Sequence, residues 1–179
     1  MPHSVPNIAI RPAEPGDQGW ITRSHDQLYQ RDEGFDETFG PLVASVLARF
    51  FAQHDPSCER GFIAEANGRP LGCVFVMRED AEAARLRLFL LLPEARGQGI
   101  GQKLHDALLG FCRASGYDRI VLSTHESHAA ACRLYQRNGW KILSRKPVRS
   151  FGNDLIELAF GKNLQSGRED PLAPDVAEG

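Results

Sequence analysis

The most informative segment of this chain reads Leu91-Leu92-Pro93-Glu94-Ala95-Arg96-Gly97-Gln98-Gly99-Ile100-Gly101. It follows a predicted strand over residues 85–92. It also opens a predicted helix, in which Ile100, Leu104, Leu108 and Phe111 recur at helical spacing. Glycines allow the backbone to approach an anion closely, and a helix start adds free N–H groups and the positive end of the helix dipole. The segment therefore predicts a site for a phosphate or pyrophosphate group.

The glycine spacing narrows the class of phosphate ligand. The three glycines follow the pattern G-x-G-x-G, whereas the dinucleotide-binding fingerprint is G-x-G-x-x-G. Asp118 lies about 20 residues further on, but it precedes the next predicted strand, which is the wrong place for a ribose contact. The sequence contains no G-x-x-x-x-G-K-S/T pattern. These observations argue against a Rossmann dinucleotide site and against a P-loop nucleotide site.

The remaining periodicity predicts a mixed α/β architecture, with a mostly antiparallel central sheet of about seven strands and about four helices. Strands are expected at residues 8–10, 61–65, 71–77, 85–92, 120–122, 140–143 and 155–160. Helices are expected at residues 20–29, 42–51, 100–111 and 130–136, with Asp17 as an N-cap, Gly116 as a C-cap and a polar loop over 31–35. Asn67-Gly68 predicts a hairpin turn, and the strand–helix–strand unit from Arg85 to Leu122 predicts one parallel strand pair.

Length and composition are those of one globular domain. The chain has 179 residues, of which 42% are hydrophobic and 25% charged. Lys plus Arg number 21 and Asp plus Glu number 23, giving a net charge of −2 without the basic excess of a nucleic-acid binder. The longest apolar run, Leu88 to Leu92, is far shorter than the ~18 residues of a membrane span. The first six residues lack the pattern of a signal peptide, so we expect a cytoplasmic protein without nucleic-acid or membrane partners.

The cysteines and histidines do not form a metal-binding pattern. The four cysteines, Cys58, Cys73, Cys112 and Cys132, include no CxxC pair. His125 and His128 are close in sequence but lack a set of acidic or thiol ligands beside them. We therefore expect no metal. Residues 165–179 are polar and contain Gly, Pro and Asp, so this tail is predicted to be disordered and residues 1–164 to form the folded domain.

Two motifs in the right order give the chain a resemblance to a known family. The glycine segment resembles the coenzyme-binding motif Q/R-x-x-G-x-G/A of the GCN5-related N-acetyltransferase (GNAT) family, which follows a strand and a proline. Residues 131–140, A-C-R-L-Y-Q-R-N-G-W, resemble the family's second motif, A-x-x-L-Y-x-x-x-G-F/W. Residues 10–17 are similar to a common start in the family. The likeness covers residues 8–164 and implies a GNAT fold that takes acetyl-CoA as co-substrate.

The chain is also similar to a narrower group, the acetyltransferase half of bacterial proteins that fuse it to a winged-helix regulator. This likeness is carried by Trp20, Ser24-His25, Leu28-Tyr29 and residues 150–155. No winged-helix segment is found in these 179 residues. We therefore expect a stand-alone acetyltransferase, as a monomer or a homodimer.

The resemblance implies a role for several positions. The backbone of Phe89, Leu90 and Leu91 would pair with the pantetheine arm of acetyl-CoA like an added strand. The following residues would form the pyrophosphate site: Arg96, Gly97, Gln98, Gly99, Ile100, Gly101 and Gln102. His128 occupies a coenzyme-binding position at which the family often has an asparagine.

Tyr135 matches the family's usual general acid, and a phenol with a pKa near ~10 can protonate a departing thiolate. The same position also fits a core tyrosine packed beside Leu134 and Trp140.

The base that accepts the proton of the incoming amine is not identified by the sequence. Many relatives place a glutamate on the strand before the glycine loop, and here Arg85 stands at that position. His25, Glu33 and Asp36 come from the segment that usually covers the substrate site, and His125 ends a strand. Each of these four fits a surface or structural role as well as a catalytic one.

Arg85 and Arg87 suggest an anionic acceptor. Strand alternation predicts Leu86, Leu88 and Leu90 on one face and both arginines, with Phe89 and Leu91, on the other. If that second face lines the acceptor cleft, two guanidinium groups could hold a carboxylate or phosphate. The arginines equally fit a solvated strand start. His25 and Tyr29 lie four residues apart on one helix face, so they fit an acceptor pocket or a hydrogen-bonded helix surface.

These observations predict an N-acetyltransferase that acts on a primary amine of a small molecule, such as an amino acid, by direct transfer in a ternary complex. No Cys or Ser lies in a nucleophile signature such as G-x-S-x-G, which argues against a covalent route. Acetylation of protein N-termini or lysines is the alternative within the fold. The non-enzymatic alternative is a module that binds acyl-CoA as a sensor without turning it over.

Overall fold

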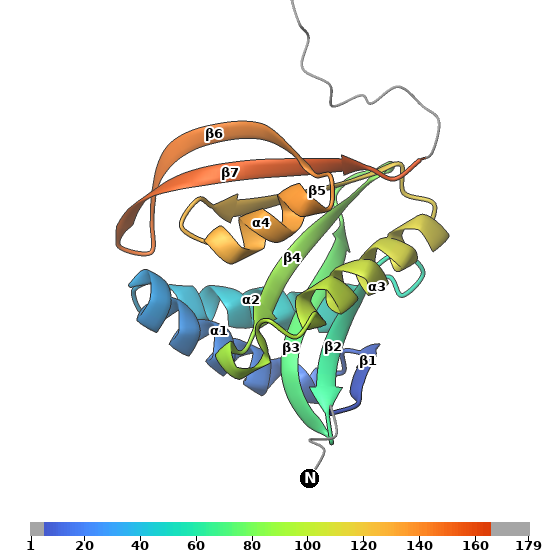
Figure 1. The fold of residues 1–179 in the computed structure, drawn as a ribbon, viewed down its shortest axis with the longest axis horizontal. Helices are drawn as coiled ribbons and strands as arrows, with labels where there is room; N and C mark the ends of the chain where they lie inside the picture. The colour runs from blue at the N-terminus through green and yellow to red at the C-terminus, as the bar shows by residue number, and fades with distance from the viewer. Residues whose placement is uncertain (1–5, 166–179) are drawn as a thin grey trace, which may run out of the picture.

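The central sheet has the strand order β1-β2-β3-β4-β5-β7-β6 in the computed structural model, which describes residues 6–165 (Figure 1). The strands are β1 (Ile8–Pro12), β2 (Arg60–Ala66), β3 (Arg69–Arg78), β4 (Ala83–Leu91), β5 (Arg119–His125), β6 (Lys141–Ser150) and β7 (Asn153–Asn163). The helices are α1 (Gln18–Glu33), α2 (Phe39–Gln53), α3 (Ile100–Ala114) and α4 (Ala129–Arg137), with short 3₁₀ turns η1 (Pro15–Asp17) and η2 (Pro93–Ala95). The predicted mixed α/β class and the order of elements along the chain are confirmed.

Only one pair of neighbouring strands is parallel. β4 runs parallel to β5, as the sequence predicts, and all other neighbours are antiparallel. The β4–β5 pairing covers only Ala83–Arg85 against Arg119–Val121. Beyond Arg85, β4 turns away from β5 while it stays paired with β3 (Figure 1). This divergence opens the sheet between β4 and β5.

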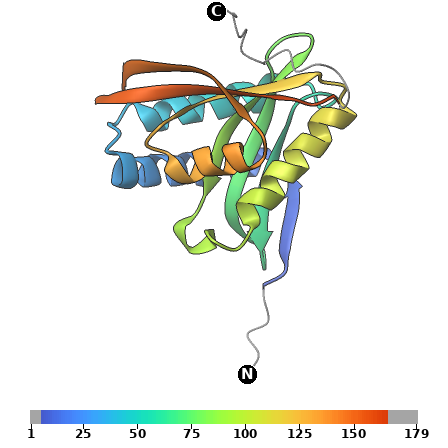
Figure 2. The same ribbon diagram turned by 45° about the horizontal axis from the view of Figure 1, so that its top comes forward.

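Two apolar clusters cover opposite faces of the sheet. Side chains that alternate along a strand go to opposite clusters. In β2, Phe62 and Ala64 pack with α3 and α4, whereas the intervening Ile63 packs with α1 and α2. β3 divides in the same way, with Val74 on the first side and Phe75 on the second. Figures 1 and 2 show α3 and α4 on one face of the sheet and α1 and α2 on the other. The two layers hold β4 between them.

A bulge in β4 overturns the predicted face assignment of that strand. The β3–β4 register shifts between Cys73 and Phe75, and Leu88 has a φ of +53°, a left-handed conformation that a leucine rarely adopts. Leu86 therefore packs on the α3 side, whereas Leu88 and Leu90 pack on the α1–α2 side.

The prediction that these three leucines share a face is therefore wrong, because an extra residue interrupts the two-residue alternation. Phe89 and Leu91 lie on the α3 side. Arg85 and Arg87 flank Leu86 in the strand, so their side chains point away from the α3 side on which Leu86 packs. The two arginines therefore lie on the opposite side from Phe89 and Leu91, contrary to the prediction.

Several predicted boundaries also differ from the structure. The segment predicted as a loop over residues 31–35 is helical to Glu33, and Gly34 ends α1 with a φ of +66°. Helix α3 ends at Ala114, and Gly116, one residue past the Ser115 cap, has the left-handed conformation. β6 extends to Ser150 and β7 to Asn163, because each of these strands continues its pairing with the other far past the apolar residues that mark it in the sequence.

The predicted disorder of the tail, past Gln165, falls outside the described residues. Within residues 6–165, the structure contains no helix long and apolar enough to span a membrane.

Candidate active site

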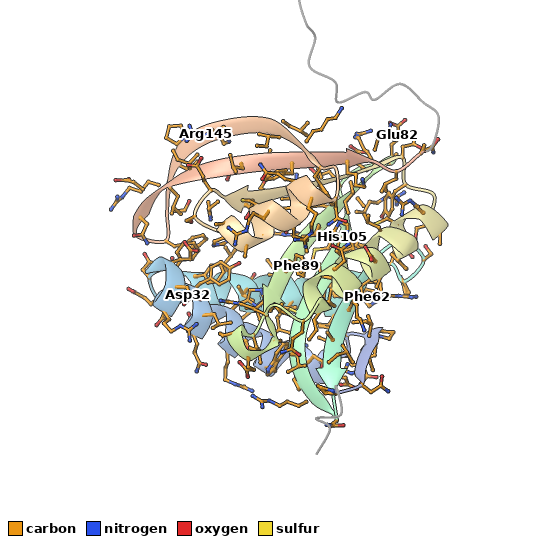
Figure 3. The ribbon with its side chains drawn as sticks, viewed as in Figure 1. Asp32, Phe62, Glu82, Phe89, His105 and Arg145 are labelled. Carbon is orange, nitrogen blue, oxygen red and sulfur yellow. The ribbon has the colours of Figure 1, made fainter. Side chains whose placement is uncertain are left out.

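A cleft of about 1050 Å³ opens where β4 leaves β5. Its walls come from α1, α2, β4, β5, the start of α4 and the turn between β6 and β7. Figure 3 shows Phe89, one of its lining residues, on β4 near the centre of the molecule. The volume is at the upper end of the range of small-molecule sites, about 300–1,000 Å³. The site therefore has room for more than one ligand group.

The glycine loop lies at the N-terminal end of α3. Gly97 and Gly99 have φ values of +73° and +76°, which explains why glycine stands at both positions. Among the described residues, the amides of residues 97–102 donate to no carbonyl or side chain, and the first backbone bond of this turn runs from the Lys103 N–H to the Gly99 oxygen at 3.1 Å. A row of free amides at the positive end of a helix dipole is suited to a phosphate or pyrophosphate group.

The side chains of this loop fix its shape. The Gln98 amide donates to the Glu94 carbonyl oxygen at 2.7 Å, and the Gln102 amide donates to the Asn138 side chain at 2.8 Å. Arg96 lies 3.5 Å from the carboxylate of Asp32 on α1. Arg96 and Gly101 line the cleft, whereas residues 97–100 and Gln102 lie beyond its lining.

The outer edge of β4 presents unpaired backbone to the cleft. Leu90 and Leu91 pair with β3 on one side, and past Arg85 no β5 residue pairs on the other. Phe89, Leu90 and Leu91 all line the cleft, as the sequence predicts for a strand that receives an extended ligand. An edge with free N–H and C=O groups can accept one more strand-like segment.

Tyr135 projects from α4 into a buried aromatic environment beside this edge. Its side chain is only 2% exposed, and its ring lies 5.4 Å from that of Trp140 and 5.5 Å from that of Phe160. Burial raises the pKa of Tyr135 above its usual value, with a smaller contribution from Tyr29. The phenol therefore keeps its proton across the working pH range and can donate it. Tyr135 lines the cleft and also packs in the core, so its catalytic role stays a prediction beside the core interpretation.

Aromatic side chains form the far wall of the cleft. The Tyr29 ring stacks on Phe39 at 4.6 Å, and Phe35 stacks on Phe151 at 4.8 Å. His25, which the sequence places on the same helix face as Tyr29, is almost fully buried behind them and lines the cleft. Its Nδ1 donates to the Ile21 carbonyl oxygen at 2.8 Å, because a carbonyl oxygen can only accept. Burial lowers the pKa of His25 to about 4, so the ring is neutral.

His128 connects α1 to β5 across the cleft. One ring nitrogen, Nε2, lies 3.3 Å from the Glu33 carboxylate, and the other, Nδ1, lies 3.3 Å from the Thr124 hydroxyl. The side chains of His128 and Glu33 are 15% and 14% exposed. Burial lowers the pKa of His128, with Glu33 acting in the opposite direction. His125 adjoins it, with ring centroids 5.6 Å apart.

The two arginines of β4 line the cleft but differ in their partners. Arg85 pairs with Glu79 at 2.5 Å and also contacts the Ser123 hydroxyl. Arg87 has no hydrogen bond or ion pair in the part of the chain that the structure describes. Arg85 and Arg49 add like charge around it, and Glu79 adds opposite charge. Burial, followed by Arg85, lowers the pKa of Arg87. Arg87 is therefore the cation of this wall that is available to a ligand.

The candidate bases named from the sequence separate into two groups. His25, Glu33 and His125 line the cleft, whereas Asp36 lies outside its lining and accepts hydrogen bonds from the backbone and hydroxyl of Thr38. Sequence reasoning missed Thr124, Glu79 and the aromatic wall. Thr124 carried no signal of its own, because its hydroxyl meets His128 through the turn between β5 and α4, and the Glu33 carboxylate reaches the same imidazole from α1.

No group of three or more metal-ligating side chains is assembled within residues 6–165.

The chain matches the model of the acetyltransferase (GNAT) family over residues 22–140. N-alpha-acetyltransferase 30 of Schizosaccharomyces pombe is 33% identical over 124 residues, which cover 67% of this chain and 81% of that protein. Mycothiol acetyltransferase of Thermobispora bispora is 35% identical over 135 residues, which cover 72% of this chain but only 38% of that protein. The matched segment therefore covers well under half the length of the second relative.

A solved structure shows the same fold. A putative acetyltransferase from Salmonella typhimurium, determined with its cofactor acetyl-CoA, superposes with a TM-score of 0.74 at 20% identity, covering 92% of this chain and 98% of that one. The family match, the relatives and the fold lead to one conclusion. The chain belongs to the acetyltransferase (GNAT) family and is an N-acetyltransferase.

Proposed function

We propose that this enzyme acetylates the primary amine of a small molecule that carries a carboxylate or another anionic group, such as an amino acid. The observation that carries the proposal is Arg87, a solvent-accessible but partly desolvated side chain of the cleft wall without a hydrogen-bond or ion-pair partner among the described residues. Glu79 is engaged by Arg85, so it does not neutralise both arginines. An anionic acceptor would supply the charge that this wall lacks.

The site fits acetyl-CoA. The free amides of residues 97–102 and the glycine conformations of Gly97 and Gly99 suit its pyrophosphate, and the open edge at Phe89, Leu90 and Leu91 suits its pantetheine arm. Arg96 and His128 line the same cleft as that edge. Arg96 is proposed as a further coenzyme contact, whereas both ring nitrogens of His128 face protein side chains. Acetyl-CoA supplies a thioester, an activated acyl group. Tyr135 is proposed to donate its proton to the departing thiolate.

The cysteines support direct transfer within a ternary complex. Burial raises the pKa of Cys73, whose thiol donates to the Leu88 carbonyl oxygen, and it also raises the pKa of Cys132 beside the cleft. A thiol held in its protonated form is a poor nucleophile. The acceptor amine itself is then the group that attacks the thioester.

Two features of the proposal concern the chain as a whole. Residues 1–164 are proposed as the N-acetyltransferase domain, acting as a monomer or homodimer, and the narrower likeness to the acetyltransferase half of winged-helix fusions is retained as part of the proposal. Acetylation of protein N-termini is the second candidate, favoured by the similarity to N-alpha-acetyltransferase 30. The cleft volume of about 1050 Å³ is compatible with either acceptor.

A coenzyme-release assay tests the proposal. Release of free CoA from acetyl-CoA is measured across amino acids, polyamines, aminoglycosides and peptides. An anionic amine should be the best substrate, and Arg87→Ala should raise its KM about 10- to 100-fold while the KM for acetyl-CoA stays unchanged, since one charged hydrogen bond contributes about 1.5–3 kcal/mol. Arg113→Ala, which removes an exposed arginine of α3 outside the cleft lining, is the matched control.

Other outcomes reject the proposal in different ways. Turnover with peptides alone would move the function to protein acetylation. Tight binding of acetyl-CoA without turnover on any acceptor would favour a sensing module.

A further inference from the structure

We propose that Thr124, His128 and Glu33 form a proton relay that removes the proton of the acceptor amine, a proposal that rests on the acetyl transfer put forward above. The three side chains come from β5, the N-cap of α4 and the end of α1. All three line the cleft that also contains Tyr135. All three lie outside the glycine loop, and the His128 ring contacts Tyr29 and Phe35 of the aromatic wall.

The geometry orders the three groups. Thr124 Oγ1 lies 3.3 Å from His128 Nδ1, and His128 Nε2 lies 3.3 Å from a Glu33 carboxylate oxygen, an ion-pair distance without hydrogen-bond alignment. A carboxylate only accepts protons, so it favours the tautomer with hydrogen on Nε2. Nδ1 then carries a lone pair that accepts from the Thr124 hydroxyl. A hydroxyl, an imidazole and a carboxylate in this sequence form a proton-withdrawing unit.

The surroundings keep the imidazole neutral and ready to accept. Its charged and titratable neighbours are Glu33 and Tyr29 from α1 and His125 from β5. Tyr29 meets the His128 ring edge-on at 4.9 Å. Burial and His125 lower the pKa of His128, and Glu33 is the one neighbour that stabilises the imidazolium. The ring is therefore neutral near neutral pH with Nδ1 unprotonated, and Glu33 is its counter-ion once Nδ1 takes a proton.

Every proton in the proposed acetyl transfer has a donor and an acceptor. A neutral acceptor amine forms the new N–C bond as the C–S bond of the thioester breaks. The amine proton passes to Thr124 Oγ1 while the Thr124 hydroxyl proton passes to His128 Nδ1, and Tyr135 gives its proton to the departing sulfur. The products are the amide and a thiol, and exchange with water restores His128 and Tyr135. Thr124 is the group that touches substrate, and Glu33 is a positioning residue.

A readout that needs no acceptor tests the tautomer on which the relay depends. In protein labelled with ¹⁵N-histidine, His128 should carry its hydrogen on Nε2 at neutral pH, with its signal assigned by its loss in His128→Gln. His25 should show the opposite tautomer, because its Nδ1 donates to the Ile21 carbonyl oxygen, and it provides an internal reference. Hydrogen on Nδ1 of His128 would overturn the relay.

The pH profile of kcat/KM tests the chemistry. Activity should fall on the acidic side as His128 becomes protonated. This limb should keep the same midpoint for two acceptors whose amine pKa values differ, whereas the separate limb from the amine itself should move with the amine pKa. His128→Gln should remove this limb and lower kcat at least ~100-fold, within the usual range for general-base removal. Glu33→Gln should move the limb to lower pH, because the carboxylate favours the imidazolium.

Thr124 variants separate the relay from a purely structural role. Thr124→Val should lower kcat at least ~100-fold with little change in acceptor KM, and Thr124→Ser, which keeps the hydroxyl, should restore most of the activity. Thr22→Val, His54→Gln and Glu37→Gln are matched controls outside the cleft lining and should match the wild type. Full activity of Thr124→Val would overturn the relay. Wild-type protein that turns over no acceptor would instead reject the proposed function, with the tautomer measurement still deciding the relay.

Discussion

The indole N–H of Trp140 donates to Nε2 of His105 at 3.0 Å in the buried core between α3 and the end of α4. Because Nε2 accepts this bond, it carries no proton, and the other ring nitrogen faces the Asp106 carboxylate at 3.2 Å. Burial lowers the pKa of His105. The bond ties the helix that follows the glycine loop to the motif that contains Tyr135. Figure 3 shows His105 on α3, facing the interior.

Neutral buried histidines make the stability depend on pH. The pKa of His25 is lowered from 6.5 to about 4 by burial, so the unfolded chain takes up a proton that the folded chain refuses. Stability is therefore full above about pH 6.5 and decreases as the pH falls towards 4. His25 alone should account for a loss of about 2 kcal/mol between pH 7 and pH 5. Urea unfolding of wild type and His25→Gln at the two pH values measures this, and an equal pH dependence of both proteins would contradict it.

Removal of the Tyr135 hydroxyl should impair chemistry without unfolding the protein. Tyr135→Phe keeps the ring that packs on Trp140 and Phe160. We expect kcat to fall about 100- to 1,000-fold, in line with the loss of a general acid, with little change in acetyl-CoA affinity or melting temperature. Steady-state assays measure kcat, calorimetric titration measures the affinity for acetyl-CoA, and thermal unfolding measures the melting temperature. Unchanged turnover would assign Tyr135 to the core alone.

An added methyl group in the glycine loop should weaken acetyl-CoA binding. A Cβ at Gly99 meets no atom within 4 Å, so the effect of Gly99→Ala comes from its φ of +76° and not from a clash. A left-handed conformation costs an alanine about 1–2 kcal/mol, which corresponds to roughly a 5- to 30-fold loss of affinity if the ligand requires that conformation. Isothermal titration measures the loss.

A second glycine of the same helix provides the control. Gly110 lies on the exposed side of α3 and has open space around its Cβ position. Gly110→Ala should leave acetyl-CoA affinity unchanged and raise stability by up to about 1 kcal/mol, because alanine favours helix. Equal affinity losses in both variants would show that the loop conformation is not the cause.

Gly61 permits β2 to pack against the aromatic core. A Cβ there would lie 2.3 Å from Phe75 Cε1 and 2.8 Å from the Cβ of Ala13. Phe75 is fully buried and cannot move aside, so Gly61→Ala should lower the free energy of unfolding by about 1–3 kcal/mol. Gly16→Ala, which meets no neighbour within 4 Å, should change it little. Denaturant unfolding compares the two, and similar stabilities would show that the core repacks.

The helices, the order of elements along the chain and the glycine loop were predictable because their signals are local. Helical spacing from Ile100 to Leu108 specifies a helix without reference to the rest of the chain, and Asn67-Gly68 specifies a turn in the same way. The placement of Tyr135 beside the cleft was also within reach, because the motif around it is continuous in sequence. The lengths of β6 and β7 could not be predicted from the sequence, because each strand extends as far as its pairing with the other.

The faces of β4 and the composition of the cleft were decided only by the tertiary structure. The bulge at Leu88 arises from pairing with β3, and it separates Arg87 from Phe89 in a way that alternation within one strand cannot show. Glu33 and Thr124 approach the same imidazole because α1 packs across the opening between β4 and β5. The sequence by itself specified the helices, the strands and the glycine loop, because their conformations depend on residues a few positions away. The order of the proton-bearing groups depends on contacts between distant segments, which form only when the two cores pack on the sheet.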